Sequence, residues 1–283
     1  MKFSNILPTS LISKYSGDFC MALANYIDLE KENEYEQEIK KTGLPIVLDN
    51  GAFETGTPDG VNNLLLKARR LDPAYVFAPD TLFNAAQTRI GFEAYEYKRI
   101  ESFDHHRVAV VVQANNLEEY LEEFKYYNMD PRVSVIGLSY LAISHSLKYK
   151  TKHEIPVTKS AQKKHPFDVF KDPDYTKDRI EMLKKIMDLK LDRIKPVHML
   201  GLGRSYEDIL FAQKNCPFCR YNDTSTCYMA ASKGLLLTEE LAVPGGKIRD
   251  KINIEDRPST VVENFLKINI KKVTLCTKSI PKQ

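Results

Sequence analysis

Residues 108–138, VAVVVQANNLEEYLEEFKYYNMDPRVSVIGL, carry the pattern that decides the fold. A continuous apolar, β-branched run at 108–112 is followed by a helical pattern at 117–127 and by a second apolar run at 134–138. Apolar runs without alternation predict strands that are buried on both faces, which is typical of a parallel sheet covered by helices. This stretch therefore predicts one strand–helix–strand unit.

The same order recurs along the chain. Further strands are predicted at 19–24, 44–48, 74–78, 197–201 and 218–221, and further helices at 60–71, 84–103, 175–189 and 206–214. Six or more such units favour an α/β fold of the (β/α)8 TIM-barrel type, with residues 1–283 as one barrel domain. A doubly wound open sheet is the alternative, but the chain has neither a G-x-G-x-x-G turn nor a P-loop motif.

Composition places the chain among folded proteins, because 43% of its residues are hydrophobic and 28% are charged. No apolar run reaches the ~20 residues that span a bilayer, and the first residues do not resemble a secretory signal. The five cysteines are an odd number, which favours reduced thiols over a disulfide framework. We therefore expect a cytoplasmic protein that has no membrane partner.

Two basic segments stand out against a formal net charge of only +3. The first belongs to an insertion at about 145–173, where six lysines accompany the single glutamate Glu154 between residues 145 and 165. The second is a C-terminal tail at about 264–283, which has no acidic residue. They are interpreted either as a solvated loop and a frayed tail or as a surface that faces a polyanion.

Polar residues follow the predicted strands at their C-terminal ends, where the active sites of βα barrels lie. These residues are Asp49, Asp80, Gln113 and Asp223. Carboxylates in such a place suit acid, base or nucleophilic chemistry at a sugar carbon, or hydrogen bonding to the edge of a base. Taken singly, each aspartate has the simpler interpretation of a helix N-cap.

No metal site is predicted. Cys216-x-x-Cys219 with Cys227 lacks a convincing fourth ligand, so these residues are interpreted as small buried thiols. The chemistry that we infer needs no cofactor.

Several short motifs occur in a fixed order: LDNGAFE at 48–54, VFAPD at 76–80, VQ at 112–113, IGL at 136–138, HMLGLG at 198–203 and ND at 222–223. They are followed by GLLLT at 234–238, KIR at 247–249 and DRP at 256–258. In order and spacing these motifs resemble those of the tRNA-guanine transglycosylase superfamily, barrel enzymes that exchange a guanine for a 7-deazaguanine.

The resemblance implies a role for each matching residue. Asp223 would be the nucleophile and Asp49 the general acid/base. The residues that bind the base would be Phe53, Asp80, Gln113, Gly137, Leu138, Leu200 and Gly201.

Two departures from the family pattern point to DNA as the substrate. The zinc motif C-x-C-x-x-C is absent after Pro258, and the arginine-bearing stretch that engages the tRNA anticodon loop is replaced by residues 224–233. A short transglycosylase without zinc resembles the 7-deazaguanine DNA transglycosylases, and the compact, lysine-rich chain is most similar to phage members. A phage-encoded protein would act in the cytoplasm of a bacterial host cell.

The expected partners are therefore DNA and a free 7-deazaguanine such as 7-cyano-7-deazaguanine. Oligomeric state is left open. The residues expected to bind the DNA backbone are Lys148, Lys150, Lys152, Lys159, Lys163, Lys164, Arg204, Lys247 and Arg249. The alternatives are the same exchange on tRNA, a catalytically inactive nucleic-acid-binding barrel, and a sugar-processing barrel that uses Asp49 and Asp223 as its carboxylate pair.

Overall fold

The computed structural model describes residues 1–148, 175–201, 205–244 and 252–278. Within these ranges eight strands form one sheet in the order β1-β8-β7-β6-β5-β4-β3-β2, and each neighbouring pair is parallel. The strands are β1 (Lys2–Asn5), β2 (Cys20–Leu23), β3 (Ile46–Asp49), β4 (Tyr75–Phe77), β5 (Arg107–Val111), β6 (Val133–Ser139), β7 (Val197–Leu200) and β8 (Cys219–Thr224).

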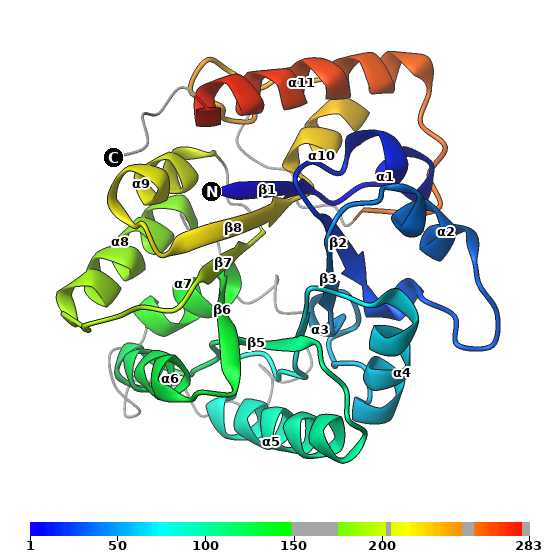
Figure 1. The fold of residues 1–283 in the computed structure, drawn as a ribbon. Coiled ribbons are helices and arrows are strands. Elements are labelled where there is room, and N and C mark those ends of the chain that lie inside the picture. The colour runs from blue at the N-terminus through cyan, green and yellow to red at the C-terminus, as the bar shows by residue number, and fades with distance from the viewer. Residues whose placement is uncertain (149–174, 202–204, 245–251, 279–283) are drawn as a thin grey trace, which may run out of the picture.

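The chain between β1 and β2 nearly closes this sheet into a ring. The Asn5 N–H donates to the carbonyl of Ser16 at 2.7 Å, and the Asp18 N–H donates to the carbonyl of Phe3 at 2.8 Å. Figure 1 shows the strands at the centre with helices around them. The predicted (β/α)8 barrel of the TIM type is confirmed. Strand β1 was not predicted, because its four residues, KFSN, mix polar and apolar side chains.

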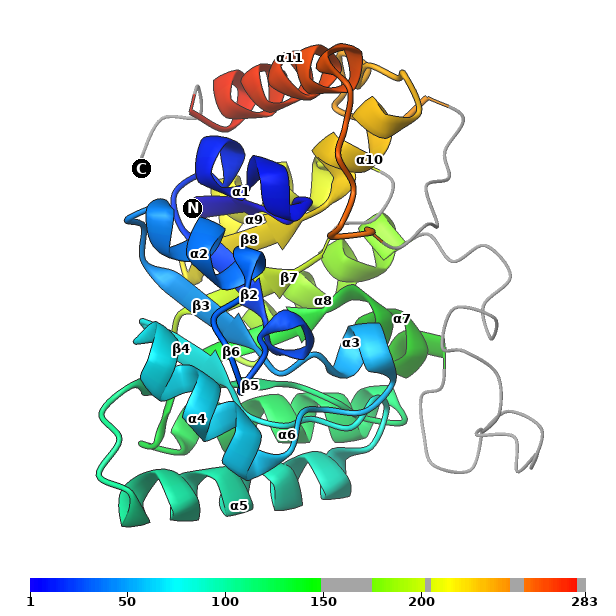
Figure 2. The same cartoon turned by 90° about the vertical axis from the view of Figure 1, so that its right-hand side faces the viewer.

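Helices separate the strands and cover the outside of the barrel (Figures 1 and 2). They are α1 (Thr9–Tyr15), α2 (Glu34–Lys41), α3 (Ala52–Thr55), α4 (Val61–Leu71), α5 (Ala85–Glu101), α6 (Leu117–Met129), α7 (Tyr140–Lys148), α8 (Tyr175–Asp188), α9 (Glu207–Asn215), α10 (Thr226–Ser232) and α11 (Thr260–Lys278). Asparagine N-caps start three of them: the side chains of Asn33, Asn84 and Asn116 accept hydrogen bonds from the first turns of α2, α5 and α6.

Two separate apolar cores follow from the alternation of side chains along each strand. In β5, Val108 and Val110 pack toward the helices, whereas Ala109 and Val111 point into the barrel. The inner core is small and contains several aromatic rings, including Phe19, Tyr75 and Phe77. The barrel interior is therefore a packed layer of side chains beneath the rim where the strands end.

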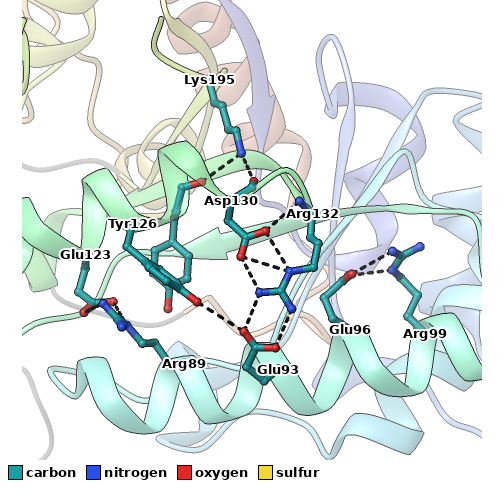
Figure 3. Close-up of polar contacts among 10 residues, drawn as sticks. Arg89, Glu93, Glu96, Arg99, Glu123, Tyr126, Asp130, Arg132 and Lys195 are labelled. Atoms are coloured by element: carbon teal, nitrogen blue, oxygen red, sulfur yellow. Dashed lines mark hydrogen bonds and ion pairs between the residues drawn. The ribbon is translucent and has the colours of Figure 1, made fainter. Parts of the chain in front are cut away.

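Ion pairs on the outer surface connect α5 with α6 and with the turn that follows α6 (Figure 3). Arg132 contacts Glu93 at 2.6 Å and Asp130 at 2.6 Å, and Arg89 contacts Glu123 at 2.7 Å. The arginines of this network are paired with carboxylates on the outside of the barrel, so we infer that they stabilise the fold.

The C-terminal segment forms a packed helix over much of its length. Leu266, Asn269 and Val273 are buried along α11, and the Asn269 side chain accepts a hydrogen bond from the Leu237 N–H at 2.9 Å. Figures 1 and 2 both place α11 beside α1 and α10. As far as residue 278, the basic segment predicted at 264–283 belongs to this helix. The sequence analysis did not predict the helix, because its buried side chains, at spacings of three and four residues, are separated by lysines. Residues 279–283 lie outside the described ranges.

The predicted insertion at 145–173 begins inside a helix. Residues 145–148 form the end of α7, which starts directly after β6. The remainder, from 149 to 173, lies outside the described residues.

Truncating an inward side chain of α5 should destabilise the fold. Phe92 is fully buried and packs against Tyr127 at a ring distance of 5.8 Å. We expect Phe92→Ala to lower the free energy of unfolding by about 3–5 kcal/mol. Tyr97→Ala, on the same helix but 66% exposed, should change it by less than about 0.5 kcal/mol. Urea unfolding followed by circular dichroism measures both; equal losses would contradict the placement of α5.

Candidate active site

The polar side chains predicted at the strand ends converge on one rim of the barrel. Asp49 is the last residue of β3, Asp223 lies near the end of β8, and Asp80 and Gln113 lie just beyond the ends of β4 and β5. The Gln113 amide donates to Asp80 at 2.6 Å, and the negative charges of Asp80 and Asp223 both act on Asp49. Helices α3 and α7, which follow β3 and β6, lie on the same side of the barrel (Figure 2).

Asp80 is held between two amides. The side-chain N–H groups of Asn50 and Gln113 donate to its two carboxylate oxygens at 2.7 and 2.6 Å, and the Gln113 oxygen accepts from the Phe83 N–H at 3.0 Å. Burial raises the pKa of Asp80 to about 6, although these hydrogen bonds act in the opposite direction. Asp80 does not cap α5, since Asn84 does. Binding of a base by Asp80 and Gln113 stays a prediction and would require exchange of these bonds.

Asp49 lies in an environment that favours its protonated form. Its Oδ2 accepts a hydrogen bond from the Gly51 N–H at 3.1 Å. Burial raises its pKa well above the ordinary range, and the charges of Glu54, Asp80 and Asp223 raise it further. Gly51 makes this turn possible, because its φ of +78° is one that side chains rarely adopt. A carboxyl group of this kind can deliver a proton at a pH where an exposed aspartate has lost it.

Asp223 is buried and is contacted on both carboxylate oxygens. Its Oδ1 lies 2.8 Å from Nε2 of His198, and its Oδ2 accepts a hydrogen bond from the Gly201 N–H at 3.3 Å. Asp223 is not an N-cap, because the Thr224 hydroxyl accepts the N–H of Thr226 at the start of α10. The hydrogen bond on Oδ2 and the close contact of Oδ1 with the imidazole orient the carboxylate in the rim.

Sequence reasoning missed the buried polar residues that support this site. His198 is fully buried, and its Nδ1 lies 2.7 Å from the hydroxyl of Tyr75. Arg179 of α8 is also fully buried; its guanidinium donates to the carbonyls of Leu200 and Gly201 at 3.1 Å. Its Nε lies 3.2 Å from the buried carboxylate of Asp208. The one sign of these residues in the sequence is a histidine within the otherwise apolar run 197–201. Nothing in the sequence around Arg179 indicates that it supports the site.

The residues expected to contact the base lie in different parts of the barrel. Phe53, on α3, is half-buried and its ring centroid lies 6.2 Å from that of Tyr140. Leu200 packs against the inner core, where a Cβ on Gly137 would lie 3.0 Å from its Cδ1. Tyr140 covers Gly201, where an added Cβ would lie 2.6 Å from its ring.

Gly137 and Leu138, which are expected to bind the base, lie inside β6. The Gly137 carbonyl accepts the N–H of Val112, and the Leu138 side chain belongs to the core between strands and helices. The structure therefore gives Leu138 a packing role, and a direct contact of its backbone with a base remains a prediction.

Most of the predicted DNA-binding cations cannot be placed. Lys148 is exposed at the end of α7, on the rim side of the barrel. The residues outside the described ranges are Lys150, Lys152, Lys159, Lys163, Lys164, Arg204, Lys247 and Arg249.

Neither a metal centre nor a membrane span is found in the part of the chain that the structure describes. No three histidine, cysteine or acidic side chains are grouped as ligands there, and none of the described helices is long and apolar enough to cross a bilayer. Cys216, Cys219 and Cys227 are buried thiols, as predicted.

Comparison with known proteins adds no family assignment. No family model and no curated protein matches the chain. Among solved structures, the chain is similar to RipC from Yersinia pestis, with 13% sequence identity and a TM-score of 0.36. That match covers 78% of this chain and 86% of the other.

Carboxyl titration tests the electrostatics of the rim. We expect Asp80 to titrate near pH 6, because it is buried, and Asp49 well above the ordinary value of about 4, because desolvation and the charges of Glu54, Asp80 and Asp223 act on it. The folded protein then binds these protons more tightly than the unfolded chain does. Their ionisation therefore lowers the free energy of unfolding as the pH rises from about 4 through the folded-state values.

Carbon-13 NMR of labelled aspartate carboxyls measures both values directly. Asp130 is the internal control, because Arg132 lowers its pKa. A pKa near 4 for both Asp49 and Asp80 would contradict their placement in this desolvated rim.

Proposed function

We propose that this protein is a base-exchange transglycosylase, which replaces guanine in DNA by a 7-deazaguanine such as 7-cyano-7-deazaguanine. The reaction would pass through a covalent bond between Asp223 and C1′ of the deoxyribose. The proposal rests on the motif resemblance and on the chemistry that the rim residues make possible.

The observation that carries the proposal is the pairing of two carboxyl groups in unlike environments on one rim. Asp223 is oriented by His198 and the Gly201 N–H, whereas Asp49 is half-buried beside acidic neighbours and has a raised pKa. A fixed carboxylate and a nearby protonated one are the two groups that substitution at a sugar carbon needs.

Each step of the exchange then balances. Asp223 attacks C1′, the bond between C1′ and N9 of guanine breaks, and the departing base keeps the bonding electrons and takes a proton from Asp49. In the second half, the incoming 7-deazaguanine gives its ring proton to Asp49 and forms the new bond to C1′. The carboxylate of Asp223 leaves with its electrons. Two inversions at C1′ restore the original configuration.

Binding of the two bases would use the surfaces that surround the carboxylates. Phe53 and Leu200 would hold the purine plane, and Asp80 with Gln113 would bind its polar edge. A guanine within a duplex must be flipped out before C1′ can be attacked, at a cost of a few kcal/mol. Lys148 and the other predicted cations would offset this cost through contacts to phosphates.

The region after β8 favours DNA over tRNA. In place of an arginine-bearing stretch, residues 226–231 form most of α10 and are all buried. Beyond residue 258, α11 occupies the region where the family's zinc motif would fall. These features support the DNA-modifying branch of the family pattern.

Removing the proposed nucleophile should abolish exchange. DNA carrying radiolabelled guanine should release the label in the presence of 7-cyano-7-deazaguanine, and Asp223→Asn should reduce this release below detection without changing DNA affinity. Asp49→Asn should slow it by about 10²–10⁴-fold, because the proton donor is lost. Filter binding and scintillation counting measure affinity and release.

Asp188→Asn is the matched control, because this aspartate is exposed at the end of α8. It should exchange at the wild-type rate.

A parallel reaction with labelled tRNA tells which nucleic acid is the substrate. Exchange in tRNA alone would refute DNA as substrate. Undiminished exchange by Asp223→Asn would refute the mechanism.

A further inference from the structure

A chain of three polar side chains crosses the apolar interior of the barrel. The Tyr75 hydroxyl lies 2.7 Å from Nδ1 of His198, and Nε2 of the same ring lies 2.8 Å from Oδ1 of Asp223. The three residues come from β4, β7 and β8, and all three are buried. The chain ends on the carboxylate to which the proposed function gives the covalent step.

The surroundings of His198 are aromatic. The rings of Phe19, Phe77 and Tyr221 lie 5.5, 5.5 and 5.9 Å from the imidazole. The titratable groups that face it from the neighbouring strands are Tyr75, Tyr221 and Asp223. Such a setting fixes the ring and strengthens each of its polar contacts, because little water competes for them.

The partners determine where the imidazole carries its hydrogen. A carboxylate can only accept hydrogen bonds, so a hydrogen on Nε2 is what makes the 2.8 Å approach to Asp223 favourable. At Nδ1 the Tyr75 hydroxyl can donate to the ring or accept from it. With Tyr75 as the donor to Nδ1, the hydrogen of the ring lies on Nε2, on the side of Asp223.

We propose that His198, oriented by Tyr75, is the positioning residue of the Asp223 nucleophile and selects Oδ2 as the oxygen that bonds to C1′. This inference rests on the proposed function. The closer contact is at Oδ1, whereas Oδ2 has the longer hydrogen bond of 3.3 Å to the Gly201 N–H. Freeing Oδ2 breaks this one long hydrogen bond and leaves the closer contact between Oδ1 and the imidazole in place.

The same contact assists both halves of the reaction. When Oδ2 bonds to C1′, Oδ1 becomes the carbonyl oxygen of the sugar ester and still faces the Nε2–H of His198. When the incoming base displaces the ester, negative charge returns to the carboxylate, and the Nε2–H stabilises it. The proton stays on His198 throughout, so the step needs no further acid or base.

The tautomer can be measured without any substrate. In the full-length protein labelled with nitrogen-15 histidine, long-range NMR correlations should show His198 as the Nε2–H form. Tyr75→Phe should change the Nδ1 shift, because its donor is lost. An Nδ1–H form of His198 would overturn the inference. This experiment succeeds or fails whether or not the protein exchanges bases.

Single-turnover release of guanine tests the positioning role. We expect His198→Leu to slow release by about 100-fold and Tyr75→Phe by about tenfold, with DNA affinity unchanged. His198→Gln, which keeps an N–H donor near Asp223, should recover part of the loss; a purely structural role would give no such recovery.

A second tyrosine–histidine pair provides the matched control. The Tyr95 hydroxyl lies 2.6 Å from Nε2 of His106, away from the rim. Tyr95→Phe deletes the same kind of contact and should leave release unchanged. Wild-type release by Tyr75→Phe and His198→Gln together would overturn the inference even where His198→Leu does not fold. If the wild-type protein releases no guanine from DNA or tRNA, the proposed function fails.

Discussion

Parallel pairing around a nearly closed ring is the constraint on which the rest of the structure depends. Because all eight strands run in one direction, their carboxyl ends meet at one rim. Residues from β3, β4, β5 and β8 that are far apart in the chain therefore become neighbours. The same constraint directs alternate side chains inward, so that His198 of β7 reaches Asp223 of β8 beneath that rim.

Acidic groups gathered in one place would repel each other, and the structure separates their environments. Asp80 is neutralised in part by hydrogen bonds from Asn50 and Gln113, and Asp223 has the contacts from His198 and Gly201. Asp49 receives one backbone hydrogen bond, and its pKa is raised by desolvation and by the charges of its acidic neighbours. Arg179 lies behind this arrangement, where it binds the carbonyls of Leu200 and Gly201 next to the Asp223 carboxylate. As a result, one carboxylate is fixed in orientation, and the other carboxyl group retains its proton.

The sequence predicted the barrel because its strands are continuous apolar runs, and it predicted Asp49, Asp80, Gln113 and Asp223 at one rim because strand ends mark that position. It did not predict β1, whose four residues have no apolar run, or α11, whose buried face is interrupted by lysines. The residues that support the site could not be predicted from the sequence either. Tyr75 and His198 are 123 residues apart, and Arg179 contacts carbonyls more than 20 residues away. Such contacts depend on how strands pack across the barrel, which no local pattern encodes.

The central claim is that the carboxylate of Asp223 becomes bonded to the sugar. Acid quenching of wild-type protein with guanine-containing DNA, followed by proteolysis and mass spectrometry, observes that bond directly. The account predicts a deoxyribose-linked peptide that contains Asp223 and that disappears when 7-cyano-7-deazaguanine is added before the quench. Base exchange with the sugar found on another residue, or with no adduct at Asp223 at any quench time, would contradict it.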